Sequence, residues 1–108
     1  MDYTPFSYVG IFYNETATVF LGVTPTLQLL ELQTEVHKIA NKYAEEVQPY
    51  SRPGDIVFHC TLATSIIMEA VPRVIEICQG YKLPKRCRIE SIDVVEYFPA
   101  ERLVSLEL

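Results

Sequence analysis

The chain has 108 residues, of which 49% are hydrophobic, and a formal net charge of −5. This length holds one domain with one core, and the composition excludes global disorder. The acidic balance argues against broad, sequence-independent binding to nucleic acid, which depends on neutralising many phosphates. Apolar runs such as Ile66-Ile67-Met68 are too short to cross a bilayer, and the first residues do not resemble a secretory signal. We therefore expect a cytoplasmic protein with no membrane partner.

The cysteines give no sign of a disulfide framework or a metal site. Cys60, Cys78 and Cys87 form no CxxC pair, their number is odd, and their spacing does not match zinc ligands. We expect small buried thiols in a reducing compartment, with no metal and no cofactor.

The first half of the chain predicts a hairpin followed by a helix. In residues 6–23, β-branched and aromatic residues flank a short polar turn, which is typical of a β-hairpin. Thr24 then suits a helix N-cap, with Pro25 at the first helical position. The predicted helix spans 24–47, because apolar residues recur there at three- and four-residue intervals: Leu29, Leu32, Val36, Ile39, Ala40, Tyr43 and Val47.

After a turn-rich link, the second half predicts a strand, a second helix and a second hairpin. The strand spans 56–63. The helix spans 68–79 and begins late enough to keep Pro72 in its first turn. The final hairpin spans 88–108, with its turn around Phe98-Pro99.

The two hairpins resemble each other in sequence. Residues 6–11 resemble 89–94, and residues 18–23 resemble 102–107, with one helix–strand–helix unit between them. This pattern suggests a repeated architecture from which the first repeat is missing. The expected fold is a single α+β domain over 1–108, with an antiparallel sheet and two helices.

One short motif in the predicted strand suits phosphate chemistry. Side chains alternate between the faces of a strand, so His59 and Thr61 project together while Cys60 points the other way. An imidazole can transfer a proton near neutral pH, and a hydroxyl can donate a hydrogen bond to a phosphoryl oxygen. By itself the motif is short, and a single strand histidine is more often structural than catalytic.

The surroundings of the motif add a family resemblance. Phe58-His59-Cys60-Thr61-Leu62-Ala63 resembles the second HxTL motif of the two-histidine (2H) phosphoesterases, the superfamily of 2′-5′ RNA ligases and cyclic nucleotide phosphodiesterases. The helix around 29–37, the strand 18–23 and the hairpin 88–108 also resemble elements of that superfamily, in its C-terminal lobe and the connection to it. The resemblance implies a bilobal α+β fold in which each lobe supplies one His-x-Thr/Ser motif to a central cleft. It also implies that one histidine acts as general base and the other as general acid, without a metal. His59 and Thr61 are then the catalytic candidates.

The chain departs from this family pattern because it has one motif where a complete site needs two. The only other histidine, His37, has no hydroxyl residue two positions later and lies in the predicted helix, off its apolar stripe. We therefore do not expect His37 to supply the second catalytic group.

Three interpretations accommodate a single motif. In the first, a homodimer places two copies of His59 and Thr61 across one cleft, and the substrate is an RNA- or nucleotide-derived phosphodiester. In the second, the protein is a non-catalytic module that binds a phosphorylated nucleotide or RNA end. In the third, the chain is a truncated remnant of a bilobal enzyme. The sequence leaves the presence of enzymatic activity open.

A basic segment is relevant to the second interpretation. Lys82, Lys85, Arg86 and Arg88 lie close together in an otherwise acidic chain. A solvated loop is the favoured explanation, and a phosphate-attracting rim is the alternative.

Overall fold

The computed structural model describes residues 2–43, 52–96 and 101–108. The chain divides into two compact units. The four-stranded unit contains Pro5–Thr24 and Phe58–Cys87, and the hairpin unit contains Met1–Thr4, Pro25–Val57 and Arg88–Leu108.

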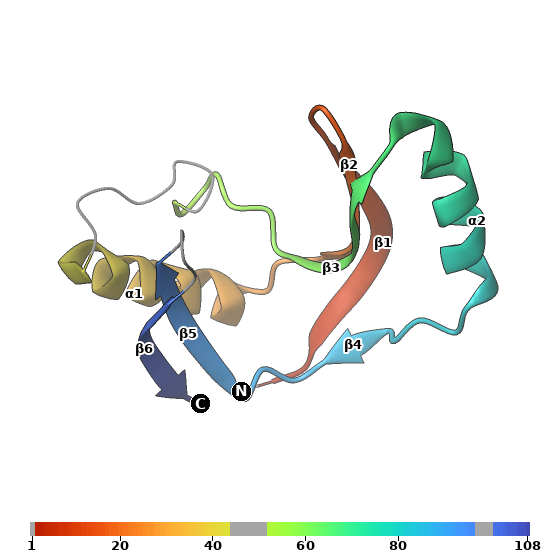
Figure 1. The fold of residues 1–108 in the computed structure, drawn as a ribbon. Helices are drawn as coiled ribbons and strands as arrows, with labels where there is room; N and C mark the ends of the chain where they lie inside the picture. Colours follow the sequence, from red (N-terminus) through yellow and green to blue (C-terminus); the bar gives the residue numbers. More distant parts are fainter. Residues whose placement is uncertain (1, 44–51, 97–100) are drawn as a thin grey trace. The chain divides into compact units, whose positions relative to one another are not determined.

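The four-stranded unit is built on an antiparallel hairpin. Strand β1 (Thr4–Tyr13) pairs with β2 (Ala17–Val23), and the turn between them is closed by the Asn14 amide, which donates to the Thr16 carbonyl at 3.0 Å. The predicted hairpin 6–23 is present, with β1 beginning two residues earlier at Thr4. Two further strands, β3 (His59–Ile66) and the short β4 (Arg86–Cys87), complete a sheet of order β3-β2-β1-β4 (Figure 1).

Strand β3 lies later in the chain than the predicted strand 56–63. The amides of Asp55 and Ile56 both donate to the Arg52 carbonyl at 3.0 Å, which holds this segment in a turn. Pairing with β2 therefore starts at His59, and it continues to Ile66, which lies opposite Ala17. The prediction of a strand start at Ile56 was wrong because a local turn competes with the apolar sequence there.

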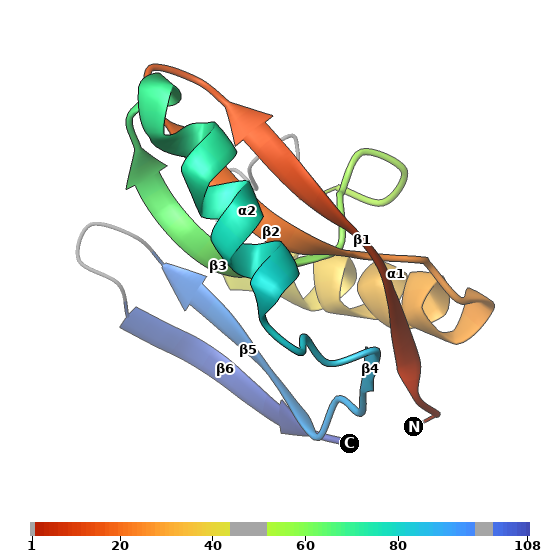
Figure 2. The same ribbon diagram turned by 90° about the vertical axis from the view of Figure 1, so that its right-hand side faces the viewer.

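The core of the four-stranded unit lies between the sheet and a helix. A 3₁₀ turn, η2 (Met68–Ala70), leads into α2 (Val71–Gly80), and Pro72 falls in its first turn, where no amide donor is needed. Figure 2 shows α2 crossing one face of the sheet. Between them, Val19 is completely buried, and the cluster around it contains Ala17, Ile66 and Val71. We call this side of the sheet the core face.

The hairpin unit combines α1 (Leu27–Tyr43) with a two-stranded antiparallel sheet of β5 (Ser91–Glu96) and β6 (Glu101–Glu107). Helix α1 begins at Leu27, so the prediction of Thr24 as its N-cap was wrong. The Thr26 hydroxyl accepts the Leu29 amide at 3.1 Å, which is the usual N-cap contact. The helix end predicted at residue 47 lies outside the described residues.

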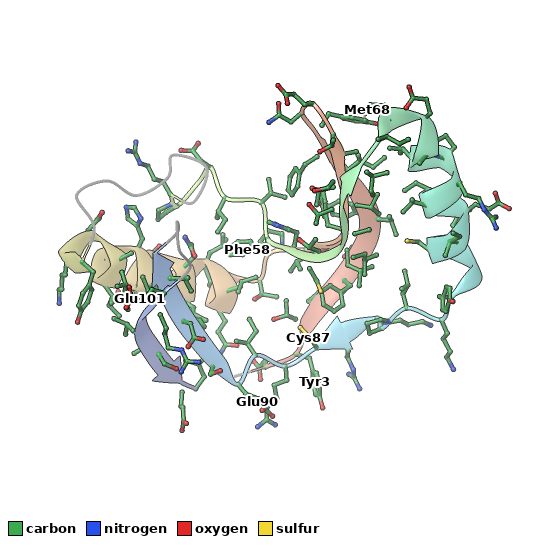
Figure 3. All side chains as sticks on the ribbon, in the orientation of Figure 1. Tyr3, Phe58, Met68, Cys87, Glu90 and Glu101 are labelled. Atoms are coloured by element: carbon green, nitrogen blue, oxygen red, sulfur yellow. The ribbon has the colours of Figure 1, made fainter. Side chains whose placement is uncertain are left out.

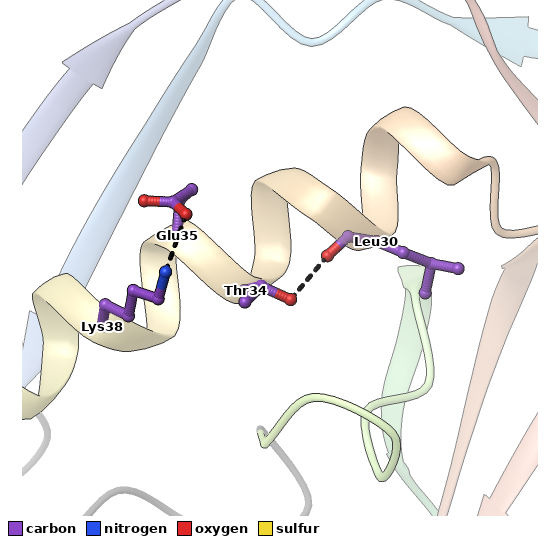
Figure 4. A network of polar contacts seen from close by, with 4 residues as sticks. All are labelled: Leu30, Thr34, Glu35 and Lys38. Atoms are coloured by element: carbon purple, nitrogen blue, oxygen red, sulfur yellow. Dashed lines mark hydrogen bonds and ion pairs between the residues drawn. The ribbon is translucent and has the colours of Figure 1, made fainter.

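The exposed side of α1 has local polar contacts (Figure 4). The Thr34 hydroxyl donates to the Leu30 carbonyl at 3.0 Å, and the Lys38 ammonium contacts the Glu35 carboxylate at 3.0 Å. Both charged side chains are about two-thirds exposed, so this ion pair stabilises the helix by only about 0.3–0.5 kcal/mol. The helix gains more from its apolar stripe, in which Leu29 is buried and Leu32, Val36 and Ile39 are half-buried.

These elements confirm the predicted α+β class, with antiparallel strands and two α-helices among the described residues. The strands fall into two sheets, one in each unit. Of the helices in the described ranges, none has the length and apolar content needed to cross a membrane.

Candidate active site

His59 and Thr61 share one face of β3, as strand alternation predicts. His59 lies opposite Gly22 of β2 and Thr61 lies opposite Phe20, whereas Cys60 between them pairs with Leu21. Antiparallel partners project to the same side of a sheet. We call the side with His59 and Thr61 the motif face; it is opposite the core face. Both side chains are exposed, and Phe58, labelled in Figure 3, precedes them at a half-buried position.

An irregularity in β3 brings a second threonine of this strand to the motif face. The register shifts between Val19 and Phe20 of β2, which lie opposite Ala63 and Thr61. Leu62 is the extra residue of this bulge, so Ala63 turns toward the core face. Thr64 then returns to the motif face, where its hydroxyl lies 3.3 Å from that of Thr18.

Two aromatic side chains from strands β1 and β2 contact the histidine on this face. The rings of Phe12 and Phe20 are stacked, with centroids 4.2 Å apart. The His59 imidazole lies nearly perpendicular to the Phe12 ring at 4.9 Å, and edge-on to the Phe20 ring at 5.4 Å. The sequence had suggested only that these residues favour strands, so their contact with His59 was missed.

Two glycines make room for the rings. A Cβ on Gly10 would lie 2.3 Å from Cζ of Phe20, and a Cβ on Gly22 would lie 2.0 Å from Cζ of Tyr8. Each ring therefore lies across the glycine opposite it. Glycine in a strand interior often marks such a close approach, which was the one sequence signal available for this cluster.

The other sequence-based candidates lie elsewhere. His37 is in α1 of the hairpin unit, half-buried, with Nδ1 buried and without a hydrogen-bond partner among the described residues. In the basic segment, Lys82, Lys85 and Arg86 are exposed in the four-stranded unit, while Arg88 belongs to the hairpin unit. The segment also has a structural function, because the Lys85 carbonyl accepts the Phe6 amide at 2.9 Å and joins β4 to β1.

A surface hollow of about 380 Å³ lies in the hairpin unit, at the ends of β5 and β6. It is lined by Arg88, Glu90, Ser91, Glu107 and Leu108, and it includes neither His59 nor Thr61. Its shallow walls mix both signs of charge, so the hollow offers no distinct chemistry.

The cysteines are free thiols, with Cys60 exposed and Cys78 and Cys87 half-buried. Burial raises the pKa of the Cys87 thiol above its ordinary value, and the nearby Cys60 raises that pKa further. In the described ranges, no three His, Cys, Asp or Glu side chains are grouped in a way that could hold a metal ion.

Taken together, the motif face places an imidazole, a group that can transfer protons, beside threonine hydroxyls on one strand. Comparison with known proteins adds a family. The family model described as the 2′-5′ RNA ligase superfamily matches residues 4–98. No curated protein and no solved structure matches the chain.

Proposed function

The chain belongs to the 2′-5′ RNA ligase superfamily, and on this premise we propose that it acts on an RNA- or nucleotide-derived phosphodiester by histidine acid–base chemistry. The single observation that supports this most strongly is the placement of His59 and Thr61 side by side on the motif face. A second subunit completes the site in this proposal. The cytoplasm is the proposed location, since three free thiols suit a reducing compartment.

In hydrolysis of a cyclic phosphodiester, water attacks phosphorus and the bond from phosphorus to a sugar oxygen breaks. One imidazole removes a proton from the attacking water, and a second imidazole gives a proton to the leaving sugar oxygen. Thr61 donates a hydrogen bond to a phosphoryl oxygen, where charge develops in the transition state. In a 2′-5′ ligation a 5′-hydroxyl takes the place of the water: it loses its proton to one imidazole as it attacks phosphorus, and the other imidazole protonates the sugar oxygen that leaves the cyclic phosphodiester.

The second imidazole is the partner subunit's His59. A twofold axis places the same surface of both subunits against each other, so one motif per chain supplies two motifs per site. His37 does not fill this function in our proposal, because it lacks the accompanying hydroxyl and lies on a helix.

The direct test is an assay of the purified protein with a 2′,3′-cyclic nucleotide and with a 2′-5′-linked dinucleotide. We expect turnover of one of them by the wild type, a loss of at least about 100-fold in His59→Ala, and wild-type rates in the control His37→Ala. Turnover that survives His59→Ala would refute the proposal. Affinity for these ligands without any turnover would instead support the non-catalytic binding module.

Mixing subunits tests the shared site. Equal amounts of wild-type and His59→Ala subunits are mixed and allowed to exchange partners. Only dimers with two intact copies can act, so the activity should be about one quarter of that of the same total amount of wild-type protein. A remainder of about one half would mean that each chain works alone. Sedimentation at the assay concentration should show a dimer, and a monomer with full activity would exclude the shared site.

A further inference from the structure

We propose that Phe12 and Phe20 are positioning residues for His59, and that Gly10 acts through Phe20. This inference rests on the proposed function of His59 and adds the residues that orient its ring. Phe12 is on β1 and Phe20 on β2, so the contacts come from two strands of the sheet.

The need for orientation follows from where His59 lies. It is the first residue of β3, its side chain is exposed, and β3 is at one end of the strand order. An exposed side chain has more than one staggered rotamer open to it, so its contacts with neighbouring side chains decide which rotamer it keeps. A proton-transfer group works only when its nitrogen is held within hydrogen-bond reach of the reacting atom.

The two phenylalanine rings lie next to the imidazole of His59 and limit the orientations that it can adopt. The two rings stack on each other with an interplanar angle of 24°. The imidazole plane makes an angle of 83° with the Phe12 ring and of 64° with the Phe20 ring, so it contacts both in an edge-on arrangement. Perpendicular ring contacts at centroid distances of 4.5–7 Å are attractive and directional. Phe20 is 4% exposed, so its own ring is held firmly by its neighbours.

Gly10 determines where the Phe20 ring can lie. Gly10 is directly opposite Phe20 in the β1–β2 register, and a Cβ there would meet three atoms of that ring at 2.3 to 3.0 Å. A methyl group on β1 would therefore displace the ring that contacts His59 on β3. Gly10 thus influences the histidine across the intervening strand, without touching it.

The experiment measures the ring position and the reaction separately. The protein has two histidines, so the imidazole proton resonances of His59 can be assigned by their loss in His59→Ala. We expect Phe12→Leu, Phe20→Leu and Gly10→Ala each to move these resonances, because each removes or displaces an aromatic ring current. Tyr13→Leu is the matched control: it is also on β1, but its side chain is 68% exposed and projects away from the motif face.

In the activity assay, the same three variants should lower kcat about tenfold or more while KM changes by less than about twofold. Phe12→Tyr keeps the ring at a half-buried position, so both the resonances and kcat should stay close to those of the wild type. If Phe20→Leu fails to fold, Phe12→Leu decides the question, since Phe12 is only half-buried. Unchanged His59 resonances in a folded Phe12→Leu would overturn the positioning proposal.

These outcomes are independent of the proposed function. If the wild type shows no turnover but the resonances move as expected, the contact of the two rings with His59 stands and the catalytic proposal fails. If His59→Ala abolishes turnover but neither phenylalanine variant alters kcat, the catalytic proposal stands and the positioning fails.

Discussion

Gly22 on β2 lies directly opposite His59 on β3, and the space beside Gly22 on the motif face is filled by the Tyr8 ring from β1. The first motif residue therefore has a neighbour without a side chain, covered by an aromatic ring. This arrangement brings residues of β1, β2 and β3 together at the position of His59. Because the Tyr8 ring fills the space beside Gly22, even a methyl group at Gly22 should lower the stability of the fold.

Gly22→Ala should destabilise the protein, because the new Cβ would lie 2.0 Å from the Tyr8 ring. Overpacking of this kind typically costs about 1–3 kcal/mol in the free energy of unfolding. The double variant Tyr8→Ala/Gly22→Ala removes the obstructing ring, so the two effects should be non-additive in urea unfolding experiments. Additive losses would mean that the ring does not limit this position.

Thr61→Val should lower activity if Thr61 donates to the phosphoryl oxygen, because valine keeps the shape and removes the donor. Loss of one such donor costs about 100-fold or more in kcat, whereas Thr61→Ser should stay close to the wild type. Thr64→Val is the control, since its hydroxyl is on the same strand and face but contacts Thr18. Equal losses in Thr61→Val and Thr64→Val would argue against a specific contribution from Thr61.

Thr26→Ala should destabilise α1 by about 1 kcal/mol, because the Leu29 amide loses its N-cap acceptor. Thr34→Ala in the same helix should be neutral or stabilising by about 0.5 kcal/mol, since alanine favours helices and the Thr34 hydroxyl bonds only back to Leu30. Far-UV circular dichroism during urea unfolding measures both. The reverse order of stabilities would contradict Thr26 as the cap.

Cys87 should react slowly with iodoacetamide compared with the exposed Cys60, because burial raises its thiol pKa and the thiolate is the nucleophile. Cys60→Ser removes the nearby ionisable group, so the pKa of Cys87 should fall and its alkylation profile should move to lower pH. Peptide mass spectrometry after alkylation at several pH values measures this shift. A profile that stays in place would exclude the influence of Cys60.

The raised pKa of Cys87 also has a consequence for stability. The folded chain holds this proton more tightly than the unfolded chain does, so the stabilisation is complete below the unfolded pKa. It declines as pH rises through the folded pKa. The stability difference between the wild type and Cys87→Ser should therefore change in alkaline solution and stay constant at neutral pH.

Local rules predicted the features that depend on neighbouring residues. The hairpin 6–23, the position of Pro72 in a first turn and the shared face of His59 and Thr61 all follow from backbone preference and strand alternation. Thr24 and Thr26 both flank Pro25, and composition does not distinguish them as caps. That choice depends on where the chain leaves β2, which the structure places at Val23.

Features set by long-range pairing could not be predicted in this way. The bulge at Leu62 depends on the register between β2 and β3, and their sequences are about 40 residues apart. Phe12 and Phe20 are ordinary strand residues by composition, and only that register brings them beside His59. The partner subunit remains a prediction that the mixing experiment addresses.

Within the described part of the four-stranded unit, β3 has a strand neighbour on one side only. A regular edge strand is a template on which other chains can add and aggregate. The two register shifts of β3 and the left-handed backbone of Ser65, with φ of 57°, interrupt that template. The same irregularity that turns Thr64 onto the motif face thus makes β3 a poorer template for strand addition than a regular strand, and we expect a variant with a straightened β3 to aggregate more readily.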